Sequence, residues 1–334
     1  MTEIAAPYLV YLGDTKMAEL AKTGAGLVYW RPERCLAQLA EPGCNADLGL
    51  PNMSVIEAAA KGAKTLVIGT AVPGGQLPPQ WVARLVEAME HGMDIASGLH
   101  VPLASTPELA EAAARTGRVL HDVRLAKKSF PIGSGKPRTG HRLLTVGTDC
   151  AIGKKYTALA IHRELVKRGI SADFRATGQT GVLIDGHGFA IDAVVSDFVA
   201  GAAETLSPAA APDHWDIIEG QGSLVHPAFA GVTLGLLHGS QPDAFVVCHE
   251  PDRNELSAFP GFPTAGINEL INLTIMLGRV TSPGIRCVGL SINTSRMSEQ
   301  DAVAELDLLS RMHKLPAIDP VRFGVSSIVS YMLK

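Results

Sequence analysis

The chain of 334 residues has few aromatic side chains, which make up 5% of it. No uninterrupted apolar run approaches the ~20 residues that a membrane-spanning helix needs, so the sequence predicts no membrane protein. The net charge is only −4, and basic and acidic residues are interspersed. This balance argues against a nucleic-acid-binding surface. Residues 1–4 lack the basic start and the apolar core of a signal peptide.

Cysteine motifs and metal-binding motifs are also missing. The five cysteines, at positions 35, 44, 150, 248 and 287, form no CxxC pair, and neither HExxH nor paired-histidine spacing occurs. An odd, scattered set of thiols is typical of reduced cysteines in a cytoplasmic protein. We therefore expect a cytoplasmic protein without a dedicated metal site.

Strand-like and helix-like segments alternate through both halves of the chain, which indicates an α/β fold with mainly parallel sheets. The length favours two domains. Residues 127–140 are dense in Gly, Pro, Ser and positive charge, and we place a linker there between domains at 1–126 and 141–334. A surface loop within one domain is the alternative. The expected strands are 8–12, 26–30, 65–71, 143–146, 172–176, 216–218, 244–248 and 287–292, and the expected helices are 79–91, 154–167, 191–206, 266–277 and 299–312.

The segment LLTVGTDCAIGKK, residues 143–155, has the layout of a phosphate-binding loop. An apolar strand ends at Gly147, a short loop follows, and a helix begins after Gly153. In such loops backbone N–H groups surround an anion, and a lysine, here Lys154, reaches its oxygens. Five residues rather than four separate the glycines, and Lys155 stands where Ser or Thr would hold Mg²⁺. The segment therefore predicts phosphate binding more clearly than ATP hydrolysis, with an ordinary strand-to-helix turn as the alternative.

Several residues in and after the loop are expected to contact the phosphates of a cofactor: Gly147, Thr148, Cys150, Ala151, Ile152, Gly153, Lys155 and Tyr156. Asn293, after the strand at 287–292, is placed to contact an adenine edge. Lys155 either meets the anion or faces solvent. Asp149 is costly beside an anion unless it holds the loop through its N–H groups. Cys150 either has a lowered pKa at the helix N-terminus or is a small filler residue.

Ligands of parallel sheets bind beyond the carboxyl ends of the strands, so polar residues that follow strands are candidates for a site. Three such segments carry ionisable or amide side chains: Arg175 with Gln179, Glu219 with Gln221, and His249 with Arg253. Arg175 would suit a substrate carboxylate. Glu219 would bind Mg²⁺ or accept a proton, with a structural turn as the alternative. His249 and Arg253 would form a proton relay or a second carboxylate site.

Five motifs together resemble a bacterial family once known only as a domain of unknown function. They are Ser97-Gly98-Leu99-His100, the GTDC loop, TGQTG at 177–181, Ser196-Asp197-Phe198 with Gly201 and Glu204, and EGQG at 219–222. The resemblance extends over almost the whole chain and implies a Rossmann-like N-terminal domain and a P-loop C-terminal domain. More distantly, GTDCAIGKK and EGQGS resemble segments of dethiobiotin synthetase.

The family includes a D-glutamate N-acetyltransferase, so the resemblance implies acetyl transfer from acetyl-CoA to the amino group of D-glutamate or a related D-amino acid. Coenzyme A carries several phosphates, so the loop would hold it without metal, and Lys155 would add a favourable charge. Asp149 or Glu219 would remove a proton from the substrate, and loop N–H groups or Lys154 would stabilise the oxyanion. Arg175 or Arg253 would hold the substrate carboxylates, with Gln179, Gln221 and His249 as further contacts.

Two other classes of function remain open. An ATP-dependent ligase or small-molecule kinase would use Glu219 to hold Mg²⁺, with Thr157 or a water replacing the missing hydroxyl. A nucleotide-sensing protein would bind without turnover. In each case we expect a small-molecule ligand, a homo-oligomer, and no nucleic-acid or membrane partner. The sequence leaves open the preferred D-amino acid, the general base and the role of the N-terminal domain.

Overall fold

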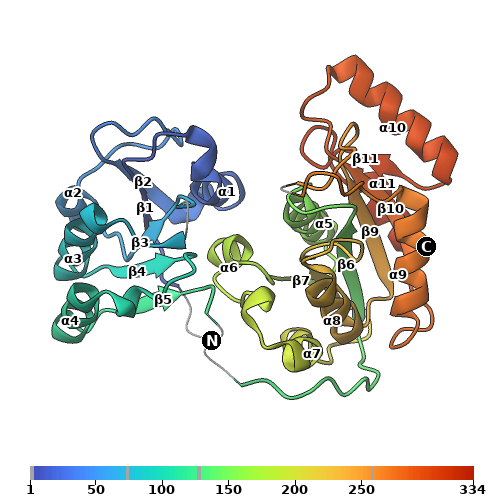
Figure 1. Cartoon of the computed structure of the whole chain (residues 1–334), viewed down its shortest axis with the longest axis horizontal. Coiled ribbons are helices and arrows are strands. Elements are labelled where there is room, and N and C mark those ends of the chain that lie inside the picture. Colours follow the sequence, from blue (N-terminus) through green and yellow to red (C-terminus); the bar gives the residue numbers. More distant parts are fainter. Residues whose placement is uncertain (1–3, 73–74, 126–128, 258) are drawn as a thin grey trace. The chain divides into compact units, whose positions relative to one another are not determined.

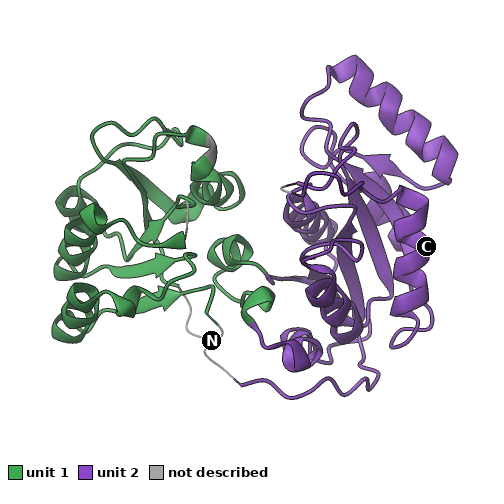
Figure 2. Ribbon diagram, viewed as in Figure 1, with its two compact units in different colours: residues 1–127, 178–193 green, residues 128–177, 194–334 purple. Residues whose placement is uncertain are grey.

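A computed structural model of the chain describes residues 4–72, 75–125, 129–257 and 259–334. The chain forms two compact units, shown in Figure 2. Unit 1 comprises Met1–Lys127 and Gly178–Ala193, and unit 2 comprises Lys128–Thr177 and Val194–Lys334. The predicted boundary between residues 126 and 127 lies outside the described residues. Among the described helices, none combines the length and apolar character that crossing a bilayer requires.

The described part of unit 1 is built on a five-stranded parallel sheet with the order β2-β1-β3-β4-β5. Its strands are β1 (Tyr8–Gly13), β2 (Cys35–Ala40), β3 (Thr65–Ile68), β4 (Asp94–Ser97) and β5 (Leu120–Asp122). Its helices are α1 (Lys22–Trp30), α2 (Val55–Ala60), α3 (Val82–Glu90), α4 (Pro107–Thr116) and α6 (Gln179–Asp185). Helices α2, α3 and α4 cover one face, where Leu85 and Met89 join Leu66 and Ile95 in the buried core (Figure 1). Burial of strands on both faces is typical of parallel sheets, and the predicted fold class is confirmed.

Residues 26–30, predicted as a strand, lie in helix α1, so this prediction was wrong. The segment GLVYW is short and apolar, and such a run does not distinguish a strand from a buried helix. In the structure Gly24, Leu27 and Trp30 are buried at intervals of three residues, which is a helical face. The helix predicted at 191–206 is also interrupted, because Val195 is extended and only Val199–Leu206 is α-helical (α7).

Helix α6 belongs to unit 1, although the sequence placed its residues in the second domain. It packs against α1, where the hydroxyls of Thr23 and Thr180 lie 3.4 Å apart. Arg31, just after α1, donates to the carbonyl of Ile184 at 3.3 Å and lies 3.6 Å from the carboxylate of Asp185. The polypeptide therefore leaves unit 2 after Thr177, contributes a helix to unit 1, and returns.

The described part of unit 2 contains a six-stranded parallel sheet with the order β11-β10-β9-β6-β8-β7. Its strands are β6 (His141–Gly147), β7 (Ala172–Arg175), β8 (Trp215–Ile218), β9 (Ala244–His249), β10 (Arg286–Ile292) and β11 (Ala317–Ile318). Its helices are α5 (Lys154–Lys167), α7, α8 (Ala230–Ser240), α9 (Ile267–Gly278), α10 (Glu299–His313) and α11 (Ser326–Met332). The five strands predicted in this half correspond to β6–β10, and each differs at its ends by no more than two residues. The helix predicted at 154–167 is α5, and the central β6 leads into it through the phosphate loop.

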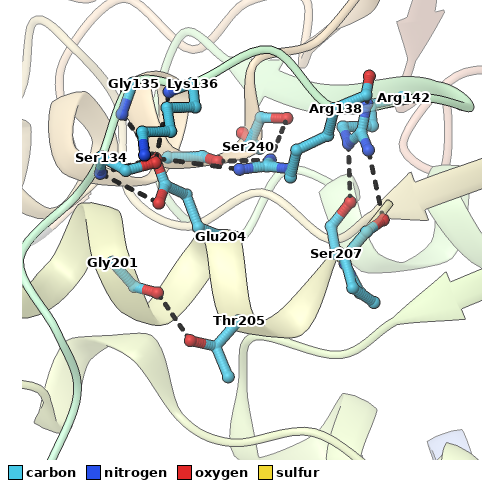
Figure 3. Close-up of polar contacts among 12 residues, drawn as sticks. Ser134, Gly135, Lys136, Arg138, Arg142, Gly201, Glu204, Thr205, Ser207 and Ser240 are labelled. Carbon is cyan, nitrogen blue, oxygen red and sulfur yellow. Dashed lines mark hydrogen bonds and ion pairs between the residues drawn. The ribbon is translucent and has the colours of Figure 1, made fainter. Parts of the chain in front are cut away.

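The described part of the predicted linker, residues 129–140, is anchored on unit 2 by helix α7. The carboxylate of Glu204 accepts hydrogen bonds from the backbone N–H groups of Ser134 and Gly135, all between 2.9 and 3.0 Å. Figure 3 shows this carboxylate facing the linker backbone, with Arg138 beside it. Gly201 lies one turn earlier, and a Cβ there would be 1.9 Å from the carbonyl oxygen of Pro131. Gly201 and Glu204 therefore fix the path by which the chain enters unit 2.

The close approach at Gly201 can be tested with a matched pair of glycine-to-alanine substitutions in helices. We expect Gly201→Ala to destabilise the protein by about 1–3 kcal/mol, because the added methyl group would clash with the backbone carbonyl of Pro131. Gly231→Ala in α8 is the control, because its methyl group would meet no atom within 4 Å. The control should be neutral or stabilising by about 0.4–1 kcal/mol. Urea unfolding of both variants measures the difference in stability. Equal stabilities would contradict the close packing of Gly201 against Pro131.

Candidate active site

The phosphate loop connects β6 to α5 at the carboxyl edge of the unit 2 sheet. Gly147 ends the strand, and Gly153 precedes the helix with a left-handed φ of +111°. Ala151 also has a positive φ, of +54°, so the loop turns sharply between the two glycines. On either side of β6 lie β8 and β9, whose following residues border the loop. This places the segment where ligands of parallel sheets bind.

Lys154 carries a buried positive charge at the start of α5. Its side chain is 7% exposed, and Nζ donates a 2.7 Å hydrogen bond to the backbone carbonyl of Asp149. Burial lowers the pKa of Lys154. Nearby acidic groups, including Glu219, partly oppose this lowering. A carbonyl carries no net charge, so the hydrogen bond leaves the charge of the ammonium unneutralised. An anion bound in the loop would offset this cost.

Asp149 holds the loop rather than facing a ligand. Its side chain is fully buried, and one oxygen accepts from the backbone N–H of Cys150 at 2.6 Å. The other oxygen accepts from Nη1 of Arg253 at 2.9 Å and from the N–H of Ser257 at 2.8 Å. Arg253 also donates to the carbonyl of Cys150 and pairs with Glu250. The guanidinium predicted to bind a substrate carboxylate is thus engaged with two carboxylates of the protein.

Glu219 follows β8 and lies beside the loop, as expected for residues at the same sheet edge. Its side chain is 4% exposed, and Oε2 accepts from the N–H of Thr177 at 3.1 Å. Gly220 lets this segment approach β6, because a Cβ there would be 1.6 Å from the carbonyl oxygen of Thr145 and 3.2 Å from Cδ of Lys154. Gln221 donates to the hydroxyl of Thr177 at 3.2 Å. The structure therefore brings Glu219 close to Lys154, and both Glu219 and Gln221 contact Thr177.

Other predicted residues also border the loop. Nδ1 of His249 lies 3.0 Å from the hydroxyl of Thr148, and burial lowers the pKa of His249. Asn293 follows β10, where its backbone N–H donates to the carbonyl of His249 at 2.8 Å. Nζ of Lys155 lies 5.4 Å above the ring centre of Tyr156. His249 therefore contacts the loop from the β9 side, and Lys155 and Tyr156 belong to the first turn of α5.

Arg175 is not brought to the loop. The guanidinium of Arg175 lies 2.7 Å from the buried carboxylate of Asp216 and 2.9 Å from that of Asp173. Asp216 lies within β8 rather than at its carboxyl end, so Arg175 points back along the sheet. Gln179 begins α6 and belongs to unit 1.

The structure decides between the alternatives left open for two side chains at the loop. Burial raises the pKa of the Cys150 thiol, so the lowered pKa considered for it was wrong and a filler role fits better. The hydroxyl of Thr157 is fully buried and bonds to the carbonyl of Gly153 at 3.0 Å and to the hydroxyl of Ser291 at 2.7 Å. It is therefore engaged in the core and poorly placed to replace the Mg²⁺-binding hydroxyl of an ATPase.

His226 is a residue of the site that the sequence did not reveal. Its Nδ1 accepts from the N–H of Ala228 at 3.1 Å, while its buried Nε2 has no hydrogen-bond partner among the described residues. Side-chain atoms of His226, Asp149 and Cys150 lie within 4.8 Å of one another. Because Arg253 already pairs with Asp149, a metal cation is disfavoured there. The sequence signal was weak, since a single histidine after the EGQGS segment has no diagnostic spacing.

Family models match both parts of the chain. Residues 131–329 match "Domain of unknown function (DUF1611_C) P-loop domain", and residues 39–126 match "Domain of unknown function (DUF1611_N) Rossmann-like domain". The chain belongs to the DUF1611 family. The family resemblance and two-domain architecture expected from the sequence are therefore confirmed.

Curated relatives and a crystal structure extend this DUF1611 assignment. The chain is 48% identical over 326 residues to a D-glutamate N-acetyltransferase of Tritonibacter scottomollicae, covering 98% of both chains. It is 46% identical over 328 residues to a protein of the same name from Pseudoalteromonas, covering 98% of this chain and 99% of that one. A crystal structure of a DUF1611 family protein from Anabaena variabilis is 31% identical and superposes with a TM-score of 0.88, covering 98% of this chain and 99% of the other.

The role of Asp149 in this DUF1611 loop can be measured through stability. Asp149→Asn removes the charge that Arg253 faces and replaces an acceptor by an N–H donor, so we expect a loss on the order of 3 kcal/mol. Asp213→Asn, at an exposed position, is the control and should change stability by less than about 0.5 kcal/mol. Chemical denaturation checks both values. A stable Asp149→Asn protein would show that the ion pair does not hold the loop.

Proposed function

We propose that this protein transfers acetyl from acetyl-CoA to the amino group of D-glutamate or a related D-amino acid. The curated relatives, which share that enzymatic name and nearly the full length of the chain, support this activity. The choice of cofactor rests on the phosphate loop, where Lys154 is a buried cation and no hydroxyl is placed to bind a metal. The hydroxyl of Thr157 is hydrogen-bonded within the core and does not fill that role. The loop therefore suits phosphates that are bound but not cleaved.

The reaction sets clear chemical demands. The substrate ammonium must lose a proton so that its nitrogen can attack the thioester carbonyl carbon. A carbon–nitrogen bond then forms and the carbon–sulfur bond breaks. The nitrogen gives up a second proton as it becomes an amide, and the leaving thiolate of coenzyme A takes up a proton. The pantetheine arm of coenzyme A separates the thioester from the phosphates. Groups that contact the phosphates therefore do not also contact the reacting carbon.

This separation bears on the roles of Lys154 and Glu219. Both were candidates for catalysis, but they lie side by side at the loop. If Lys154 holds phosphate oxygens, Glu219 is placed to orient Lys154 and the Thr177 backbone rather than to accept the substrate proton. We therefore assign both residues to cofactor binding. Asp149 is assigned to loop structure, since its carboxylate accepts three hydrogen bonds and pairs with Arg253. Proton removal falls to a group at the other end of the cofactor.

Ligand-induced thermal shifts test the cofactor. Acetyl-CoA should raise the unfolding temperature without added Mg²⁺, because a ligand that binds only the folded state stabilises it. Lys154→Ala should weaken acetyl-CoA binding roughly 10- to 100-fold, the cost of one charge-assisted contact. Lys167→Ala, exposed at the far end of α5, should bind normally. Stabilisation by ATP with Mg²⁺ and none by acetyl-CoA would overturn the proposal in favour of a ligase or kinase.

Steady-state kinetics separate binding from proton transfer at Glu219. Release of free thiol on addition of D-glutamate reports the reaction. We expect Glu219→Gln to raise KM for acetyl-CoA several-fold and to leave the shape of the kcat-versus-pH profile unchanged. If the acidic limb of that profile disappears in the variant instead, Glu219 is the general base and the assignment above is wrong.

Compartment and assembly complete the proposal. All five cysteines are free thiols, which supports a reducing compartment such as the cytoplasm. A homo-oligomer stays a prediction, and light scattering of the purified protein measures it directly.

A further inference from the structure

Unit 1 contains a cavity of about 180 Å³, which has no part in the proposed binding of phosphates. It lies beyond the carboxyl ends of neighbouring strands, since Thr70 follows β3, His100 follows β4 and Arg124 follows β5. Lys22, Thr23 and Gln179 complete the polar part of its wall. In the order β2-β1-β3-β4-β5, the direction in which successive strands are added to the sheet reverses beside β3. In open parallel sheets, small ligands bind beyond the carboxyl ends of the strands at such a reversal.

The lining of the cavity is cationic. It includes Lys22 and Arg124, and none of its lining residues is acidic. Arg124 has a counter-ion, because its guanidinium lies 2.5 Å from the carboxylate of Asp192. Lys22 forms no ion pair or side-chain hydrogen bond among the described residues. The wall therefore has a net positive charge that an anionic ligand would neutralise.

Thr70 provides an independent sign of a ligand. It is 4% exposed, and its hydroxyl has no hydrogen-bond partner among the described residues. Leaving a buried hydroxyl unpaired costs roughly 1–3 kcal/mol, so native structures usually provide a partner. Since Thr70 lines the cavity, a polar atom of a bound molecule would satisfy it.

Two sequence motifs meet at this cavity. Gly98 and His100 come from the Ser97–His100 segment, and Gln179 comes from the TGQTG segment. The motifs approach closely, because a Cβ at Gly98 would lie 3.0 Å from Cγ of Gln179. A Cβ at Gly75 would lie 2.6 Å from the ring of His100, and the ring therefore packs directly against the Gly75 backbone. Gln179, expected to contact substrate, thus lines a polar cavity of unit 1.

We propose that this cavity binds the carboxylate groups of the D-amino acid substrate. The inference rests on the proposed acetyltransferase function for the identity of the ligand, whereas the geometry alone defines a site for a small carboxylate. The volume is below the ~300–1,000 Å³ of sites for drug-sized ligands, which suits an amino acid and excludes coenzyme A. Unit 1 then selects the acceptor, while the loop of unit 2 holds the acyl donor.

Calorimetric titration of the whole protein tests the site, with D-glutamate, D-glutamine and D-lysine as probes. D-Glutamate should bind most tightly, and Lys22→Ala should weaken its binding roughly 10-fold or more. Thr70→Val removes the hydroxyl at constant shape, so we expect weaker D-glutamate binding without loss of stability. Lys61→Ala, exposed at the end of α2, is the matched control and should bind as the parent protein does.

Kinetics distinguish failure of this site from failure of the proposed function. Lys22→Ala and Thr70→Val should raise KM for D-glutamate and leave the thermal shift with acetyl-CoA unchanged. Unaltered D-glutamate binding in both variants would overturn the site even if the protein is an acetyltransferase. If D-glutamate binds and both variants weaken it, yet no thiol is released from acetyl-CoA, the carboxylate site stands and the proposed reaction falls.

Discussion

The buried ion pair between Asp149 and Arg253 supports the architecture of unit 2 at its functional edge. A loop that is to surround an anion must present N–H groups and positive charge, and these repel one another when no ligand is present. Asp149 resolves this conflict by accepting hydrogen bonds from Cys150 and Ser257 while it neutralises Arg253. Because the carboxylate is fully buried, its interactions are weakly screened by solvent. The loop is thereby kept open around Lys154, whose ammonium group donates to a backbone carbonyl.

Both units use the same physical principle in different ways. Parallel strands end at one edge, so residues far apart in the sequence converge there. In unit 2 the edge of β6, β8 and β9 collects the loop, Glu219 and His249, and Gly220 allows its backbone to approach that of Thr145. In unit 1 the edge of β3, β4 and β5 collects small polar and cationic side chains around a cavity. We therefore propose one anion-binding environment in each unit, at the loop of unit 2 and in the cavity of unit 1.

Much of the fold could be predicted because local signals were strong. Gly153 and Gly169 bracket α5, and apolar runs mark the buried strands of unit 2. The strand predicted at 26–30 failed because five apolar residues carry no clear period. At the site, the sequence correctly indicated which strand ends bear polar residues, but it could not assign their partners. Arg175 pairs with Asp216, 41 residues away, and Arg253 pairs with Asp149, 104 residues away, and no local spacing reveals such pairs.

Helix α6 has a consequence for how the chain can be divided. The polypeptide passes between the units three times, near residues 127, 177 and 193, rather than once. A single cut in the segment 129–140 would leave α6 attached to unit 2 and would separate it from α1, its packing partner. The buried side chains of Val182, Leu183 and Ile184 would then face water. The halves are therefore not modular in sequence, although each is compact in space, and an exchange of domains between relatives would have to carry residues 178–193 with the N-terminal half.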